Sequence, residues 1–251
     1  MPERLRSCGM IRWVFLDVGN ILLDEDPLAY RCTRMHFDAA REILPNLTFT
    51  AFLARREARA AQGSRWPLYG VVSEILDEEA CARIWESAER EIRAGYARLS
   101  PVIAGAHELV DRLSTRFQLG LIANQGPECR ERLEALGLLH HFPVAVLGDE
   151  LGLAKPDARL FQLALEGAGV PPQECAMIGD RLDNDIGPAA ALGLRTIWVR
   201  WPRRAAKGWR PDDPDAIAFR DSLERTQGPI EGCSPDFAVD DLSEIDGLFR
   251  S

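Results

Sequence analysis

Apolar and polar residues follow two different patterns along this chain. A short apolar run from Trp13 to Leu16 ends abruptly at Asp17. An uninterrupted run of this length is typical of a parallel strand buried on both faces, and such a strand delivers the next residue to the crevice at the carboxyl edge of the sheet. Gly19 and Asn20 tolerate positive φ, so we expect a sharp turn behind Asp17.

From Asp24 to about Leu99 the pattern is helical and poor in strand signals. Thr48 is placed to cap a helix that ends before Pro67. A longer helix follows, in which apolar residues recur at three- and four-residue spacing: Cys81, Ile84, Trp85, Ala88, Ile92 and Tyr96. This part of the chain is predicted to be a helical insertion.

Beyond Ser100, strands and helices alternate. We predict strands at 117–124, 144–147, 175–178 and 194–198, an edge strand at 235–239 and a closing helix at 240–249. This alternation predicts an α/β fold with a doubly wound parallel sheet. We therefore expect a Rossmann-like core of residues 1–26 and 100–251, with residues 27–99 as an inserted helical subdomain.

A basic stretch lies between the last two predicted strands. It holds Arg203, Arg204, Lys207 and Arg210 beside Trp201 and Trp209, and acidic residues follow at once. We interpret it as a solvated loop whose charges pair with one another, followed by a short helix at 215–225.

Composition narrows the class of protein. The 251 residues are 27% charged and 46% hydrophobic, as in an ordinary globular protein, and the net charge is −9. This charge argues against a nucleic-acid or anionic-membrane partner. The six scattered cysteines suggest reduced thiols, and no apolar run reaches the length of a membrane span, so we expect a cytoplasmic protein. Nothing in the sequence sets its oligomeric state.

Carboxylates gather after the predicted strand at 175–178. Asp180 follows Gly179 directly, and Asp185 lies five residues further on in the same loop. Paired carboxylates at a sheet's carboxyl edge suit a hard cation such as Mg2+. Asp183 and Asp185 could instead only cap the next helix, an explanation that does not apply to Asp180.

Three segments together resemble the motifs of the haloacid dehalogenase superfamily. The run ending in Asp17 resembles the first motif, in which the Asp attacks phosphorus. Lys155, within Gly152 to Asp157, resembles the third motif, and Met177 to Ile186 resembles the fourth, with Asp180 and Asp185 at the metal positions. The insertion at 27–99 looks like the helical cap of the dehalogenase, phosphoglycolate-phosphatase and β-phosphoglucomutase branch.

This resemblance implies a set of roles. Asp17 and Lys155 are the expected catalytic residues, and Asn124, Gln125 and Lys155 are expected to bind phosphate, the first two through backbone N–H groups. Mg2+ is the expected cofactor, with four ligands: Asp17, the carbonyl of Gly19, Asp180 and Asp185. Arg31, Arg34, Arg55 and Arg59 are basic candidates for substrate selection in the cap.

Two residues depart from the family pattern. Gly19 stands where relatives usually carry a second Asp, the general acid and base, which is worth roughly a hundred- to ten-thousandfold in rate, or about 3 to 5.5 kcal/mol. Ala123 replaces a hydroxyl residue, and a lost hydrogen bond to a charged group is worth roughly 1.5 to 3 kcal/mol.

Three functions remain open at this point. The first is a Mg2+-dependent phosphatase that acts on a small phosphorylated metabolite through an aspartyl-phosphate on Asp17, possible without the usual acid because phosphoryl transfer depends mainly on positioning and charge. The second is a 2-haloacid dehalogenase, whose halide leaves without a proton, but that branch typically lacks the Gly179–Asp180 pair and carries Tyr at the position of Gly19. The third is a catalytically weak relative used for binding or regulation.

Overall fold

The computed structural model describes residues 10–64, 66–226 and 233–249. The chain forms two compact units. The first contains Met1–Leu23, Ile103–Trp201 and Pro229–Ser251, and the second contains Asp24–Val102 and Pro202–Gly228. Each unit is therefore assembled from segments that are separated in the sequence.

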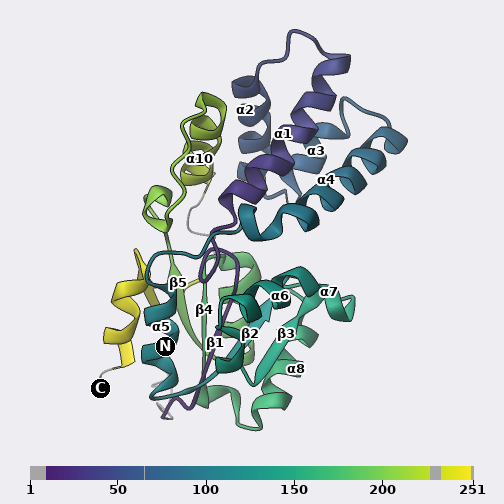
Figure 1. The fold of residues 1–251 in the computed structure, drawn as a ribbon. Helices are drawn as coiled ribbons and strands as arrows, with labels where there is room; N and C mark the ends of the chain where they lie inside the picture. Colours follow the sequence, from purple (N-terminus) through teal and green to yellow (C-terminus); the bar gives the residue numbers. More distant parts are fainter. Residues whose placement is uncertain (1–9, 65, 227–232, 250–251) are drawn as a thin grey trace, which may run out of the picture. The chain divides into compact units, whose positions relative to one another are not determined.

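The first unit is built on a six-stranded, fully parallel sheet (Figure 1). Its strands are β1 Trp13–Leu16, β2 Gln118–Ala123, β3 Val144–Leu147, β4 Cys175–Gly179, β5 Arg195–Val199 and β6 Phe237–Val239. The order across the sheet is β3-β2-β1-β4-β5-β6. Each predicted strand has a counterpart, and the doubly wound parallel fold is confirmed.

Helices flank this sheet and connect its strands. They are α5 Ala106–Ser114, α6 Pro127–Ala135, α7 Gly148–Leu151, α8 Ala158–Ala168 and α9 Gly187–Leu192, with shorter helices η1 Leu139–His141, η2 Pro172–Glu174, η3 Leu182–Ile186 and η5 Leu242–Phe249. Phe15, Phe161 and Met177 pack in the core between the sheet and the helices. Gly120 is needed beside Phe15, because a Cβ at Gly120 would lie 2.5 Å from the Phe15 ring.

The second unit is helical. It contains α1 Asp26–Ile43, α2 Phe49–Ala61, α3 Pro67–Val72, α4 Glu78–Leu99 and α10 Pro214–Thr226, with the short η4 Arg204–Lys207. Thr48 caps α2 as expected, since its side chain accepts a hydrogen bond from the Ala51 N–H. Phe219 of α10 is fully buried with Phe37 and Phe52 in the apolar core of this unit. The segment that carries η4 and α10 is therefore an integral part of the helical unit.

The interpretation of the basic stretch as a solvated loop is wrong for two of its residues. Lys207 is fully buried, and its Nζ lies 2.9 Å from Asp24 Oδ1 and 2.7 Å from Asp26 Oδ2. Arg204 is also buried, with its Nη1 2.6 Å from Asp26 Oδ1. Buried charges need partners of opposite sign. Here the partners are Asp26 at the start of α1 and Asp24 just before it, in a distant segment that the local charge pattern did not reveal.

Most of the basic residues proposed for substrate selection are held by ion pairs within the second unit. Arg31 pairs with Glu91, Arg34 with Asp38 and Asp215, and Arg59 with Glu74. Arg55 is exposed. Among the described residues, no helix is both long and apolar enough to cross a membrane.

Candidate active site

Asp17 follows the central strand β1 and is held by its own backbone. Its N–H donates to the Ile178 carbonyl of β4 at 2.9 Å, and its Oδ1 accepts the Val18 N–H at 2.7 Å. The turn behind it places positive φ on Asn20, at 57°, rather than on Gly19. The expected sharp turn is present, and Asp17 as a whole residue is only 7% exposed.

Asp180 and Asp185 lie beyond the end of the neighbouring strand β4. Gly179 allows this loop to fold closely, because a Cβ there would lie 2.4 Å from Cβ of Asp185. Asp185 Oδ2 accepts the Arg181 N–H at 2.9 Å, so this side chain also braces its own loop. Asp183 accepts hydrogen bonds from Nε and Nη2 of Arg181.

The sheet brings three of these carboxylates together. One oxygen from each of Asp17, Asp180 and Asp185 lies within 4.8 Å of the others, and all three residues are buried. In the described part of the chain this is the single group of acidic, histidine or cysteine side chains with such spacing. A compact set of hard oxygen donors fits Mg2+, and buried carboxylates this close need a cation.

Lys155 supplies one positive charge to this cluster. Its Nζ lies 2.7 Å from Asp17 Oδ1 and 2.6 Å from Asp185 Oδ1, and the residue is 2% exposed. Asn124 holds the backbone of Lys155 from both sides: its Oδ1 accepts the Lys155 N–H at 2.6 Å, and its Nδ2 donates to the Lys155 carbonyl at 3.2 Å. The side chain of Asn124 thus positions Lys155.

The electrostatics follow from this geometry. Burial raises the pKa of Asp17 well above its ordinary value, the charges of Asp185 and Asp180 raise it further, and Lys155 opposes them. Burial also disfavours the charged form of Lys155, but Asp17 and Asp185 outweigh it and raise the pKa of this ammonium group. The cluster therefore carries more negative charge than Lys155 alone can balance.

Sequence reasoning missed the contacts that support the loops. Trp198 Nε1 donates to the carbonyl of Asp180 at 2.9 Å, and Trp201 Nε1 donates to the carbonyl of Asn20 at 2.7 Å. The glycine before Asp180 was a visible signal of close packing. The tryptophans gave no such signal, because the order of strands across the sheet was unknown.

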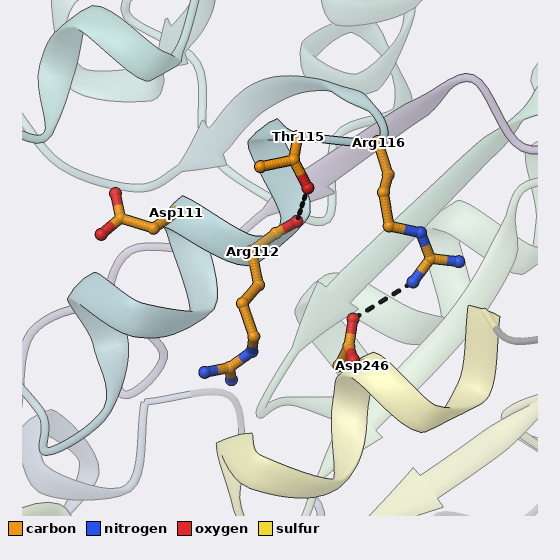
Figure 2. A pocket seen from close by; sticks show the side chains of 5 residues that line it. All are labelled: Asp111, Arg112, Thr115, Arg116 and Asp246. Carbon is orange, nitrogen blue, oxygen red and sulfur yellow. Dashed lines mark hydrogen bonds and ion pairs between the residues drawn. The ribbon is translucent and has the colours of Figure 1, made fainter.

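A hollow in the first unit lies apart from these residues, between α5 and η5 (Figure 2). Arg116 occupies it, with Nη1 3.1 Å from Asp246 Oδ1 and Nη2 donating to the Phe249 carbonyl at 2.5 Å. Asp111, Arg112 and Thr115 form the other wall. These contacts attach η5 to the segment just after α5.

The fold and the carboxylate cluster together define a class: α/β proteins that carry an aspartate, a lysine and paired acids at the carboxyl ends of parallel strands. Residues 11–193 match the haloacid dehalogenase-like hydrolase family, and residues 152–245 match a second HAD-like hydrolase family. The chain belongs to the haloacid dehalogenase-like hydrolases. The matched region includes Asp17, Lys155, Asp180 and Asp185.

Named phosphatases are among the relatives. The chain is 38% identical over 179 residues to a phosphoserine phosphatase of Thermus thermophilus, which covers 70% of this chain and 62% of the relative. It is 32% identical over 220 residues to the pyrimidine 5′-nucleotidase YjjG of Escherichia coli, over 82% of this chain and 90% of the relative. The chain thus spans less than two thirds of the Thermus protein.

Solved structures share the fold at low sequence identity. The putative HAD-hydrolase YfnB from Bacillus subtilis, bound to magnesium, superposes with a TM-score of 0.62 at 19% identity, over 97% of this chain and all of that chain. L-2-haloacid dehalogenase from Xanthobacter autotrophicus gives a TM-score of 0.59 at 19% identity, over 96% and 99%. At these identities the likeness shows the fold alone.

Proposed function

We propose that this protein is a Mg2+-dependent phosphatase that hydrolyses a small phosphorylated metabolite through an aspartyl-phosphate on Asp17. The observation that carries the proposal is the buried cluster of Asp17, Asp180 and Asp185, two of which contact the ammonium group of Lys155. A bound Mg2+, held by these three acids and the Gly19 carbonyl, would neutralise charge on the transferring phosphoryl group. The phosphatase names of the relatives support the same reaction class.

The chemistry takes two steps. A carboxylate oxygen of Asp17 forms a bond to phosphorus as the ester oxygen leaves, and the alcohol takes up one proton. Water then attacks the aspartyl-phosphate, which releases inorganic phosphate and a proton and restores the carboxylate. The ammonium group of Lys155 favours the ionised form of Asp17, against the effect of burial on its pKa, and balances phosphoryl charge, while backbone N–H groups of Asn124 and Gln125 are proposed to hold the phosphate oxygens.

The two departures from the family motifs, Gly19 and Ala123, predict modest turnover. Gly19 has no carboxylate with which to protonate the leaving oxygen, so the proton has to come from water or from another residue. Ala123 offers no hydroxyl to the phosphate. We propose that the helical unit, with residues 27–99 as its main part, is the cap that selects the substrate.

The cellular compartment of the protein and its binding partners are proposed on separate grounds. The described cysteines are free thiols, which supports a reducing compartment such as the cytoplasm. The net charge of −9 supports a small metabolite rather than nucleic acid or a membrane surface as the partner.

A substrate panel tests the proposal directly. Phosphate release should be measured with and without Mg2+ on phosphoserine, glyceraldehyde 3-phosphate and pyrimidine 5′-monophosphates, the compounds named by relatives. Mg2+-dependent release is expected for at least one of these or a related ester. Asp17→Asn should abolish it, whereas the control Asp183→Asn should retain it, because Asp183 pairs with Arg181 outside the carboxylate cluster. Activity that survives in Asp17→Asn would refute the covalent mechanism.

A further inference from the structure

The two tryptophans near the carboxyl end of β5 contact the backbones of both acid-bearing loops. Trp198 donates its indole N–H to the carbonyl of Asp180, and Trp201 donates its indole N–H to the carbonyl of Asn20. Asp180 belongs to the loop after β4, and Asn20 to the turn after β1. One short segment of chain therefore holds both loops.

The Trp201 contact joins two residues with positive φ. Asn20 has φ 57° and Trp201 has φ 46°, and they are the two residues other than glycine with positive φ in the described chain. A bulky residue adopts this backbone conformation only where its surroundings enforce it, and such positions cluster at functional sites. Trp201 is 2% exposed, so its ring is fixed by packing. Its indole N–H is therefore a rigid donor.

This contact acts on the carbonyl of Gly19 through the peptide plane. The Asn20 N–H donates to the Leu23 carbonyl at 2.7 Å, and it shares a planar peptide unit with the Gly19 carbonyl. The Trp201 bond fixes the other side of Asn20, at its own carbonyl. With both sides of Asn20 held, the direction of the Gly19 carbonyl is also fixed.

Trp198 has the corresponding effect on Asp180. It lies opposite Gly179 in the β4–β5 register, and its indole N–H reaches the carbonyl of Asp180, the residue that follows β4. Gly179 places little restriction on the backbone before Asp180. The indole hydrogen bond at 2.9 Å supplies the missing restraint.

We propose that Trp198 and Trp201 are positioning residues for the metal site, and this inference rests on the proposed function. Trp201 orients the Gly19 carbonyl and Trp198 orients Asp180. Mg2+ demands near-ideal octahedral geometry, so ligands on separate loops have to be held in register before the ion binds. The indoles provide this order without touching the ion.

The test uses Trp198→Phe and Trp201→Phe in the full chain, each of which removes the indole N–H and keeps an aromatic ring. Trp13→Phe is the matched control, because Trp13 stacks on Phe15 at the amino end of β1, away from both loops. Backbone hydrogen exchange is measured in the metal-free proteins. The Mg2+ concentration that gives half of the thermal stabilisation is then measured for each.

Trp201→Phe should speed exchange in residues 18–23, and Trp198→Phe should speed it in residues 180–186. Each variant should need roughly ten- to a hundredfold more Mg2+, the usual effect of losing a residue that orients a metal ligand. Trp13→Phe should lower thermal stability and leave the Mg2+ midpoint unchanged. Unchanged exchange in both loops, or midpoints within twofold of the unsubstituted protein, would overturn the inference.

The same data separate this inference from the proposed function. If Mg2+ fails to stabilise even the unsubstituted protein, the metal-dependent reaction is refuted, and with it the claim on Mg2+ affinity. The exchange comparison would still decide whether the indoles hold the loops.

Discussion

Replacing Lys155 with Met tests the charge balance of the site. Lys155 is buried and contacts both Asp17 and Asp185. Removing one partner of a buried ion pair costs about 3 to 5 kcal/mol, because the remaining charge is left without compensation. For a protein of this size 1 kcal/mol corresponds to roughly 2 to 4 °C, so the metal-free variant should melt about 6 to 20 °C lower.

Mg2+ should restore more stability to this variant than to the unsubstituted protein. Lys155 repels a cation at the same carboxylates, and its removal leaves Asp17 and Asp185 without the ammonium group that contacts both of them, so that Mg2+ has more negative charge to neutralise. At a concentration one hundred times its dissociation constant, a ligand contributes about 2.7 kcal/mol, and a tighter constant contributes more. The assay is thermal unfolding over a series of Mg2+ concentrations.

Lys207→Met is the matched control. Lys207 is equally buried and contacts two carboxylates, Asp24 and Asp26, in the second unit. It should destabilise the protein by a similar amount, but its Mg2+ shift should be no larger than that of the unsubstituted protein. If metal-free Lys155→Met is as stable as the unsubstituted protein, or if its Mg2+ shift is not larger, this account of the site is wrong.

Three further substitutions test individual residues. Burial, Asp185 and Asp180 raise the folded-state pKa of Asp17 above 3.8, so the favourable contribution of Asp17 to the free energy of unfolding is complete below pH 3.8 and is lost as the pH rises through the folded pKa. Metal-free Asp17→Asn should therefore unfold at a higher temperature than the unsubstituted protein at neutral pH. An equal or lower melting temperature would contradict the raised pKa. Gly19→Asp should raise turnover of alkyl phosphates by roughly a hundredfold or more and turnover of aryl phosphates by less, since only alkoxide leaving groups need the proton. Normal Mg2+ affinity without any gain on alkyl esters would show that another group already supplies the proton. Gly179→Ala should weaken Mg2+ binding, because its Cβ would lie 2.4 Å from Asp185, and calorimetric titration that finds an unchanged affinity would show that the loop relaxes freely.

The sheet and the meeting of the acids could be predicted from sequence for a simple reason. Asp17 and Asp180 each follow an apolar run, and parallel strands place their carboxyl ends at one edge, so the two carboxylates had to lie on the same side of the sheet. The proximity of Lys155 came from the resemblance rather than from periodicity. The catalytic roles of these residues remain predictions.

Long-range partners could not be predicted in this way. Lys207 looked like one charge in a polar stretch, and its burial depends on Asp24 and Asp26, far away in the sequence. Trp198 reaches Asp180 because β5 lies beside β4, and strand order is set by packing of the whole sheet. Local patterns carry neither kind of information.

The ion pairs between the start of α1 and η4 also bear on the order in which the protein matures during synthesis. Arg204 lies 178 residues after its partner Asp26. At roughly 5 to 20 residues per second, a ribosome needs about 9 to 36 seconds to cover that distance. Until then Asp26 has no cation from this segment, and Phe219 is missing from the apolar core of the second unit. The helices at 26–99 are made well before residues 202–228, yet their unit can be completed only once that later segment has been made, so a nascent chain stopped before Pro202 should remain open to proteases and chaperones.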